Sequence, residues 1–372
     1  MLIIQFMLGL VVLVLGAELF VRGASRLAAL VGISPLIVGL TVVAFGTSAP
    51  EVAVSVQAGL EGQGGIALGN IIGSNISNLL LILGISAMVA PLMVSLRLIK
   101  LEVPLLLGIS VLVFFLAVDR RISRLEGLLL LTGAVLYTVF LIWQYRRENP
   151  TGVSDDRVAL TDYPSRLTPP GDTRRVWLQN ILLLVVGLVS LVFGARWLVH
   201  GASGMARVLG VSELVIGLTV VAVGTSLPEL ATSIAAAMRG ERDMAIGNVI
   251  GSNLFNLLLV MGSGAIVAPQ GLPVPSSSIS FDIPVMIAVT AASLPIFFSG
   301  YVISRWEGLL LFGYYGAYIL YLLLFSVQHD LLPAYSTTML RYILPLTALM
   351  LILVLAKAFW THSRSKPVIT SR

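Results

Sequence analysis

The chain has 372 residues, of which 57% are hydrophobic and only 11% are charged, and its formal net charge is +5. Soluble domains carry about 25% charged residues, so this composition excludes a water-soluble globule and indicates a polytopic membrane protein. Because the chain has no cysteine, disulfides, thiolate metal sites and cysteine nucleophiles are excluded as well.

Long apolar stretches dominate the sequence. A stretch of about 18 apolar residues is long enough to cross a bilayer as a helix, and the alternation typical of a membrane β-barrel is absent. The sequence therefore predicts an all-α polytopic membrane protein. The eleven expected spans are 3–21, 33–60, 66–92, 101–118, 124–143, 177–198, 211–238, 244–268, 282–299, 303–326 and 340–360.

The first stretch is expected to remain as a helix. No basic segment precedes it, and Glu18, Arg22 and Arg26 follow it, which is the reverse of a secretory signal.

The basic residues predict the orientation. Counted along alternate loops, 17 of the 23 Lys and Arg residues fall on one side, and that side is expected to be cytoplasmic. The N-terminus is then outside and the C-terminus inside, and the net charge reports topology rather than a nucleic-acid partner. Residues 146–176 are rich in Pro, Asp and Arg and are expected to form a solvated cytoplasmic linker. Their acidic residues lack the spacing of an EF-hand.

The chain contains an internal duplication. Shifting the sequence by 178 residues aligns 23–91 with 201–269 without a gap and gives 38 identities in 69 positions. Each copy holds five spans, so the second copy must enter the bilayer from the opposite face, which predicts inverted-topology repeats. The expected division is a first five-helix repeat at 1–145, the linker at 146–176, a second, inverted repeat at 177–326, and an extra C-terminal transmembrane helix with its cytoplasmic tail at 327–372.

The best-matched stretches carry a glutamate within an apolar span. Glu51 and Glu229 occupy equivalent places in GLTVVAFGTSAPE and GLTVVAVGTSLPE. A carboxylate at the bilayer centre costs at least about 2.5 kcal/mol, and it is a functional-site hypothesis by default; a pair of structural, protonated glutamates is the alternative. Pro50 and Pro228 precede them and are expected to break the helix. The break would free carbonyl groups near Ala44 and Ala222 to act as ligands.

Further polar residues flank these glutamates. Thr47 and Ser48 match Thr225 and Ser226, and the next span of each copy carries GNIIGSNISN or GNVIGSNLFN. Ser74 and Asn78 share a helix face because they are four residues apart. The other interpretation is helix packing through glycine, Ser and Asn, which weighs most for Asn75 and Asn253. The candidate metal-ligating residues are Glu51, Glu229, Thr47, Thr225, Ser48, Ser226, Ser74, Ser252, Asn78, Asn256, Ala44 and Ala222.

These candidates offer only oxygen ligands. Carboxylate, amide, hydroxyl and carbonyl oxygens suit Ca²⁺ and Na⁺, whereas a transition metal favours His or Cys. An anionic substrate would be repelled by two buried carboxylates.

The paired G-T-S-x-P-E and G-x-x-x-G-S-N-x-x-N motifs resemble the α-repeats of the calcium/cation antiporter superfamily, and are most similar to prokaryotic sodium/calcium exchangers. The resemblance covers about residues 1–326 and implies that the candidates line a central site binding Ca²⁺ and Na⁺ alternately. Some members place an aspartate where Asn256 stands, and the eleventh helix exceeds the usual ten. The implied protein is a Ca²⁺/Na⁺ antiporter of a bacterial or archaeal cell inner membrane, with inorganic cations and the lipid bilayer as partners. No enzymatic activity, cofactor, nucleic acid or oligomer is implied.

Three other functions remain open. A Ca²⁺/H⁺ or other cation/proton exchanger needs carboxylates that titrate near the working pH. A membrane enzyme using Ser48 or Ser226 lacks a His or Lys base in either motif. A cation channel is less compatible with two broken helices in inverted repeats.

Overall fold

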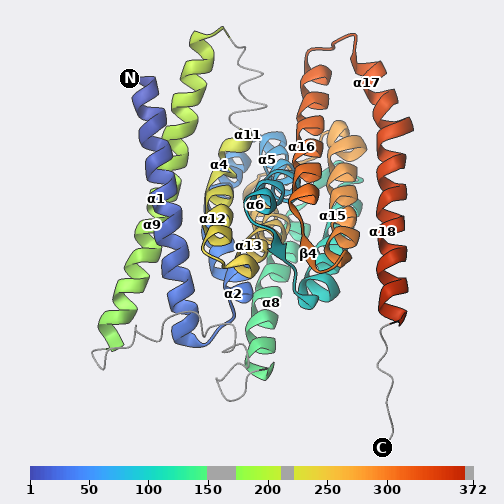
Figure 1. Ribbon diagram of the computed structural model, residues 1–372. Coiled ribbons are helices and arrows are strands. Elements are labelled where there is room, and N and C mark those ends of the chain that lie inside the picture. Colours follow the sequence, from blue (N-terminus) through green and yellow to red (C-terminus); the bar gives the residue numbers. More distant parts are fainter. Residues whose placement is uncertain (149–172, 211–221, 365–372) are drawn as a thin grey trace, which may run out of the picture.

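The structure is a computed structural model that describes residues 1–148, 173–210 and 222–364 (Figure 1). Within these ranges it is almost wholly helical. Nine helices are long and apolar enough to cross a membrane, and the bent pair Pro35–Thr47 and Ala49–Leu60 is a tenth candidate. The predicted all-α membrane architecture is confirmed. Of the expected span 211–238, residues 211–221 lie outside the described part and the rest contains a short apolar helix, Leu227–Met238.

The first half of the chain forms these elements: α1 (Leu2–Val31), α2 (Pro35–Val38), η1 (Gly39–Val43), α3 (Ala44–Thr47), α4 (Ala49–Leu60), α5 (Gly64–Ser77), η2 (Asn78–Ile82), α6 (Leu83–Val89), β1 (Leu92–Met93), η3 (Leu98–Glu102), α7 (Val103–Leu116), β2 (Arg121–Ile122) and α8 (Arg124–Glu148). The elements marked η are single π-helical turns, which often occur at functional sites.

The second half forms α9 (Thr173–Val208), α11 (Ala222–Gly224), α12 (Leu227–Met238), α13 (Arg242–Phe255), η7 (Asn256–Val260), α14 (Met261–Val267), β3 (Leu272–Pro273), η8 (Ser278–Asp282), α15 (Ile283–Phe298), β4 (Val302–Ile303) and α16 (Arg305–Ser326). It is followed by α17 (Leu332–Thr338), η9 (Met339–Ile343) and α18 (Leu344–Arg364). Helices α8 and α9 extend into both ends of the expected linker at 146–176, of which 149–172 lie outside the described residues.

Two long helices stand at one side of the molecule, where α1 crosses α9 (Figure 1). Glycines every seven residues let them approach closely. A methyl group added at Gly9 would lie 2.4 Å from Leu198 N, and one at Gly16 would lie 2.7 Å from Leu191 N. A methyl group added at Gly194 of α9 would likewise lie 2.5 Å from Leu13 N of α1. At these glycines the backbones of the two helices are in direct contact, as is common where small residues face each other between membrane helices.

The central helices are the most buried part of the fold. Segments Gly64–Val89 and Arg242–Val267 are 83% buried in their most apolar window. Helix α13 lies directly against the first broken span, because a methyl group at Gly247 would meet Leu36 O at 2.7 Å and one at Gly251 would meet Ala44 Cβ at 2.8 Å. Residues from the two halves of the chain therefore meet at the centre.

Short antiparallel strand pairs also join the two halves. Strand β1 pairs with β4 through Leu92 and Ile303, and β2 pairs with β3 through Ile122 and Leu272. Each pair links a segment between two helices of one copy to such a segment of the other.

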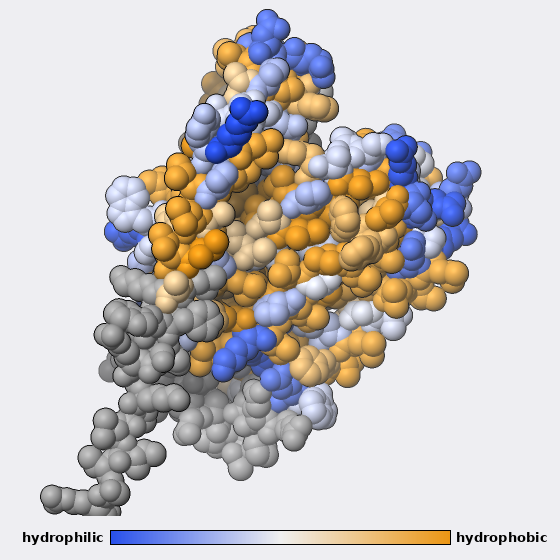
Figure 2. Space-filling model, turned by 90° about the vertical axis from the view of Figure 1, so that its right-hand side faces the viewer, coloured by the Kyte–Doolittle hydropathy of each residue, from blue (hydrophilic) through white to orange (hydrophobic). Residues whose placement is uncertain are grey.

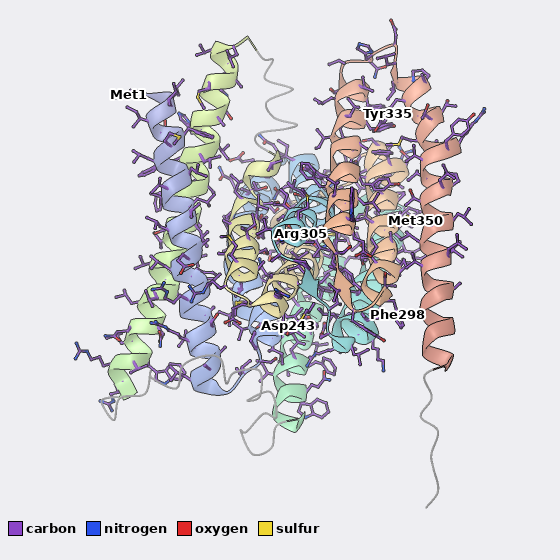
Figure 3. The ribbon with its side chains drawn as sticks, in the orientation of Figure 1. Met1, Asp243, Phe298, Arg305, Tyr335 and Met350 are labelled. Atoms are coloured by element: carbon purple, nitrogen blue, oxygen red, sulfur yellow. The ribbon has the colours of Figure 1, made fainter. Side chains whose placement is uncertain are left out.

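The periphery is apolar, as a bilayer requires. Hydrophobic side chains cover much of the face in Figure 2. Helix α18 stands at the edge opposite α1 and α9, and its Met350, labelled in Figure 3, is 44% exposed. It packs on α15, and a hydrogen bond between Tyr314 and Thr347 ties it to α16. The extra C-terminal helix is thus an addition to the outside of the bundle.

Candidate cation-binding site

Both copies interrupt a membrane helix directly before the glutamate. Helix α3 ends at Thr47 and α4 begins at Ala49, with a bend of 43° between the two parts. In the second copy α11 ends at Gly224, and two turn residues precede α12. Pro50 and Pro228 lie in the first turn of the new helices, where the missing N–H costs nothing. The predicted breaks are confirmed.

The two glutamates lie at the starts of these helices. Glu51 and Glu229 are each 1% exposed, and each occupies the first turn of its helix, where the helix dipole favours a negative charge. Among the described residues, none of their four carboxylate oxygens has a hydrogen-bond partner. The carboxylates are close enough to act on each other electrostatically. Two such carboxylates in a low-dielectric interior must either bind protons or be balanced by a cation from outside the chain.

Hydroxyl groups of the first copy lie beside the carboxylate of the second, and other hydroxyls of the two copies contact each other. The hydroxyls of Thr47 and Ser48 lie beside the carboxylate of Glu229. Thr47 Oγ1 is 3.5 Å from Ser252 Oγ, and Ser226 Oγ donates to Ser74 Oγ at 3.4 Å. The site is therefore built across the two copies rather than within either one.

The asparagines introduce π-helical turns next to the glutamates. Asn78 begins η2, which packs against α12, and Asn256 begins η7, which packs against α4. Asn78 Nδ2 donates to Asn253 Oδ1 at 2.9 Å, and this bond leaves its Oδ1 unpartnered. In the described part of the chain, neither amide atom of Asn256 has a partner.

The two candidate carbonyl ligands belong to the first residues of short helices, Ala44 of α3 and Ala222 of α11. Ala44 O accepts a hydrogen bond from Ser48 N at 3.0 Å, and a carbonyl oxygen has a second lone pair for another partner. Ala222 is the first residue of α11. Of the twelve candidate residues, the structure buries Ala44, Thr47, Ser48, Glu51, Ser74, Asn78, Ser226, Glu229, Ser252 and Asn256.

The chemistry of this cluster suits a hard cation. All its candidate ligands are oxygens, and buried oxygens without hydrogen bonds cost about 1–3 kcal/mol each. A Ca²⁺ ion takes six to eight such oxygens in flexible geometry. Across the described ranges, no group of three or more His, Cys, Asp or Glu side chains could hold a metal ion, so the site depends on two carboxylates supplemented by neutral ligands.

Asn248 is the central residue that the sequence did not single out. It is 1% exposed and bonds to residues of both copies. The sequence did contain an indication of its importance, because the duplicated motifs GNIIGSN and GNVIGSN both carry an asparagine at this position, Asn70 and Asn248.

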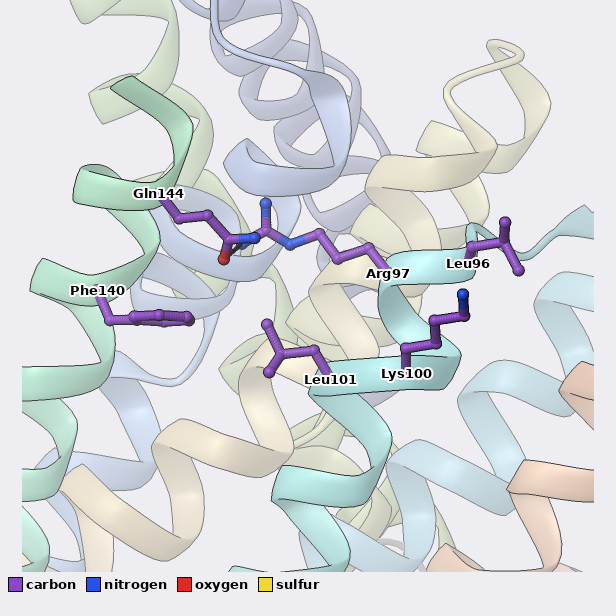
Figure 4. Close-up of a pocket in the computed structure, with 6 residues that line it drawn as sticks. All are labelled: Leu96, Arg97, Lys100, Leu101, Phe140 and Gln144. Atoms are coloured by element: carbon purple, nitrogen blue, oxygen red, sulfur yellow. Dashed lines mark hydrogen bonds between the residues drawn. The ribbon is translucent and has the colours of Figure 1, made fainter. Parts of the chain in front are cut away.

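A third buried carboxylate, that of Glu102, also escaped sequence reasoning. Glu102 is fully buried and accepts hydrogen bonds from Tyr137 at 2.8 Å and Arg97 at 3.2 Å. Arg97 also donates to Gln144 at 3.2 Å across a pocket of about 440 Å³ between α8 and η3 (Figure 4). Because Glu102 has its own cation and donor, we interpret this cluster as a clasp between helices.

The broken helices, the buried oxygens and the apolar periphery together define a membrane cation transporter. The family profile described as "Sodium/calcium exchanger protein" matches residues 1–144 and 179–324. The chain belongs to this family. It is a multi-pass integral membrane protein that moves inorganic cations, Ca²⁺ among them, by antiport, and it is not an enzyme.

Individual relatives agree with this assignment. The sodium/calcium exchanger MaX1 of Methanosarcina acetivorans is 34% identical over 340 residues, which cover 85% of this chain and 97% of the relative. The inner membrane protein YrbG of Escherichia coli is 38% identical over 287 residues, covering 77% and 86%. A solved structure of the sodium-calcium exchanger NCX_Mj, soaked with Na⁺ and Sr²⁺, has a TM-score of 0.70 and 31% identity, and covers 84% of this chain and 95% of that one.

Proposed function

We propose that the protein exchanges Na⁺ for Ca²⁺ by alternating access at the site between the two broken helices. The observation that carries this proposal is the pair of buried carboxylates, Glu51 and Glu229, which the described residues leave without a hydrogen bond. The proposed ligands are the twelve residues predicted from the sequence. Ca²⁺ would draw chiefly on the carboxylates, and Na⁺ on hydroxyl, amide and carbonyl oxygens.

Charge balance requires at least two monovalent cations in place of each Ca²⁺. With Asn78 and Asn256 neutral, the ionised site carries two negative charges, which one Ca²⁺ or two Na⁺ neutralise. Two Na⁺ can then replace one Ca²⁺ without leaving the carboxylate charges uncompensated. The relative MaX1, which is named a sodium/calcium exchanger, supports Na⁺ as those monovalent cations.

An inverted arrangement of the two copies supports alternating access. Equivalent helices α1 and α9 run antiparallel, because Gly9 meets Leu198 whereas Gly23 meets Leu184. Two copies related in this way offer the same site to opposite sides of the membrane in turn.

We also propose that the N-terminus is outside the cell and the C-terminus in the cytoplasm, from the distribution of Lys and Arg. Reporter fusions within residues 149–172 and after Lys366, both outside the described residues, should report the cytoplasmic side, opposite to Met1. Reporters on opposite sides would refute this orientation.

Flux measurements test the function. Purified protein in liposomes loaded with Na⁺ should accumulate ⁴⁵Ca²⁺ when external Na⁺ is removed, and an imposed K⁺ or H⁺ gradient should not substitute for Na⁺. Uptake driven by a pH gradient alone, and insensitive to Na⁺, would instead establish Ca²⁺/H⁺ exchange. Uptake that needs no counter-ion and does not saturate would indicate a channel.

A further inference from the structure

Asn248 forms the densest set of polar contacts near the glutamates. Its Nδ2 lies 3.1 Å from Thr232 Oγ1 and 3.0 Å from Ser233 Oγ, and it is also 3.4 Å from the backbone oxygen of Glu229. These groups all belong to the first turns of α12. The amide nitrogen therefore anchors the helix that carries Glu229.

The oxygen of the same amide faces the other copy. Asn248 Oδ1 accepts from Thr47 Oγ1 at 3.3 Å. Thr47 Oγ1 also lies 3.1 Å from Val43 O and 3.4 Å from Ala44 O. A hydroxyl has one proton to donate, so these three oxygens compete for it with one another, with Ser252 Oγ and with the nearby Glu229 carboxylate. When Asn248 receives the proton, both carbonyls are relieved of this bond.

The equivalent residue in the first copy is placed differently. Asn70 is partly exposed, and its Nδ2 has no hydrogen-bond partner in the part of the chain that the structure describes. The position equivalent to Thr232 holds Val54, which has no hydroxyl to receive the bond. Asn70 is therefore a matched control for Asn248.

We propose that Asn248 is a positioning residue that couples the two broken helices and tunes the site for Na⁺. It fixes the start of α12 and draws the Thr47 proton away from the Ala44 carbonyl, so that the Thr47 and Ala44 oxygens are free to bind a monovalent ion. The proposal rests on the proposed function, because it assigns the role within that cation site.

The role predicts a selective change in ion affinity. Na⁺ depends on neutral oxygens such as those of Thr47 and Ala44, whereas Ca²⁺ depends chiefly on the carboxylate oxygens. Asn248 bonds to the backbone oxygen of Glu229 but to neither carboxylate. Asn248→Ala should raise the Na⁺ concentration that gives half-maximal Ca²⁺ release by about three- to tenfold, the value of one hydrogen bond. Half-saturation of Ca²⁺/Ca²⁺ self-exchange, measured without Na⁺, should change less than about twofold.

Two further variants separate positioning from loss of structure. Asn70→Ala should leave both half-saturation values unchanged. The double variant Thr232→Val/Ser233→Ala keeps Asn248 but removes the anchors of its Nδ2, and should reproduce part of the Na⁺ effect. Equal changes in the Na⁺ and Ca²⁺ values for Asn248→Ala, or equal effects of the Asn248 and Asn70 variants, would overturn the proposal.

A second readout distinguishes the failure of this role from the failure of the proposed function. The midpoint of thermal unfolding of the purified protein should rise as Na⁺ is added. The Asn248→Ala variant should require a higher Na⁺ concentration than wild type for the same rise in the midpoint. If wild-type protein shows that rise and the variant shifts it, but Na⁺ drives no Ca²⁺ flux, exchange is refuted and the positioning role stands. If wild-type protein exchanges and the variant is indistinguishable from wild type, only the positioning role is refuted. If Na⁺ neither stabilises the protein nor drives flux, both are refuted.

Discussion

The two copies of the polar motif have nearly the same sequence but different hydrogen bonds. In the first copy, Thr47 and Asn78 are bonded to Asn248 and Asn253 of the second. Their counterparts Thr225 and Asn256 have side-chain atoms that find no partner among the described residues. Each motif is surrounded by the other copy, so small differences in one copy change the contacts of the other. At the serine position the asymmetry is reversed, because Ser226 bonds to Ser74 whereas Ser48 Oγ has no partner among the described residues.

The clasps on the periphery differ in a similar way. Glu102 meets both Tyr137 and Arg97, whereas the corresponding Asp282 accepts from Tyr318 at 3.2 Å and is only partly buried. The position equivalent to Arg97 is Ser277. Duplication therefore preserved the acid–tyrosine pair but not its charge balance.

The largest expected effect falls on the feature that the copies share. Glu51→Gln and Glu229→Gln should each abolish exchange while the protein still inserts, because one remaining carboxylate only half neutralises a divalent ion in a low-dielectric site. ⁴⁵Ca²⁺ uptake into liposomes, with the elution profile as the check on folding, measures the loss. Near-normal transport by either variant would refute the role of that carboxylate.

The asparagines should respond unequally. Asn78→Asp loses the donor to Asn253 and sets a carboxylate against the Asn253 carbonyl, so Ca²⁺ transport should fall about tenfold or more. Asn256→Asp adds the same negative charge but breaks no hydrogen bond among the described residues, so transport should fall less than for Asn78→Asp. The same flux assay compares the two, and equal losses would show that the difference between the copies has no functional weight.

The unpartnered oxygens of the second copy, including those of Thr225 and Asn256, offer room for a third Na⁺. A third ion would leave one extra positive charge on the sodium-loaded form, and moving one charge is worth about 2.3 kcal/mol per 100 mV. Sodium-driven Ca²⁺ flux should therefore respond to a potential clamped with K⁺ and valinomycin. Flux that is indifferent to the potential and carries no current would establish electroneutral two-for-one exchange.

The smallest effect concerns the peripheral clasps. Tyr137→Phe removes one of two partners from the fully buried Glu102 and should lower the midpoint of thermal unfolding by about 1–4 °C. Tyr318→Phe should lower it less, because Asp282 is partly exposed to begin with. Differential scanning fluorimetry of the two variants in one detergent makes the comparison, and a larger shift for Tyr318→Phe would contradict it.

Sequence reasoning succeeded where a local rule decides the structure. Pro50 and Pro228 break their helices through the proline ring itself, and the burial of Glu51 and Glu229 follows from the apolar residues around them. It failed for Asn248 and Glu102. Asn70 and Asn248 are identical within their motifs, and only the neighbouring copy decides which of them is buried. The partners of Glu102 are Tyr137, on another helix, and Arg97, five residues earlier in the chain. Neither spacing corresponds to neighbours on one face of a helix.

The glycine seam between α1 and α9 imposes an order on the assembly of the protein. Gly16 of α1 packs against Leu191, and Gly9 against Leu198, so each partner leaves the ribosome long after the residue that it covers. During synthesis α1 must stay in the bilayer with its seam facing lipid, and contacts so distant in sequence form late. Backbone glycine offers little surface to a wrong partner in that interval. Until α9 is inserted, the glycine face of α1 therefore stays uncovered, and only a helix that packs closely against its backbone can cover it.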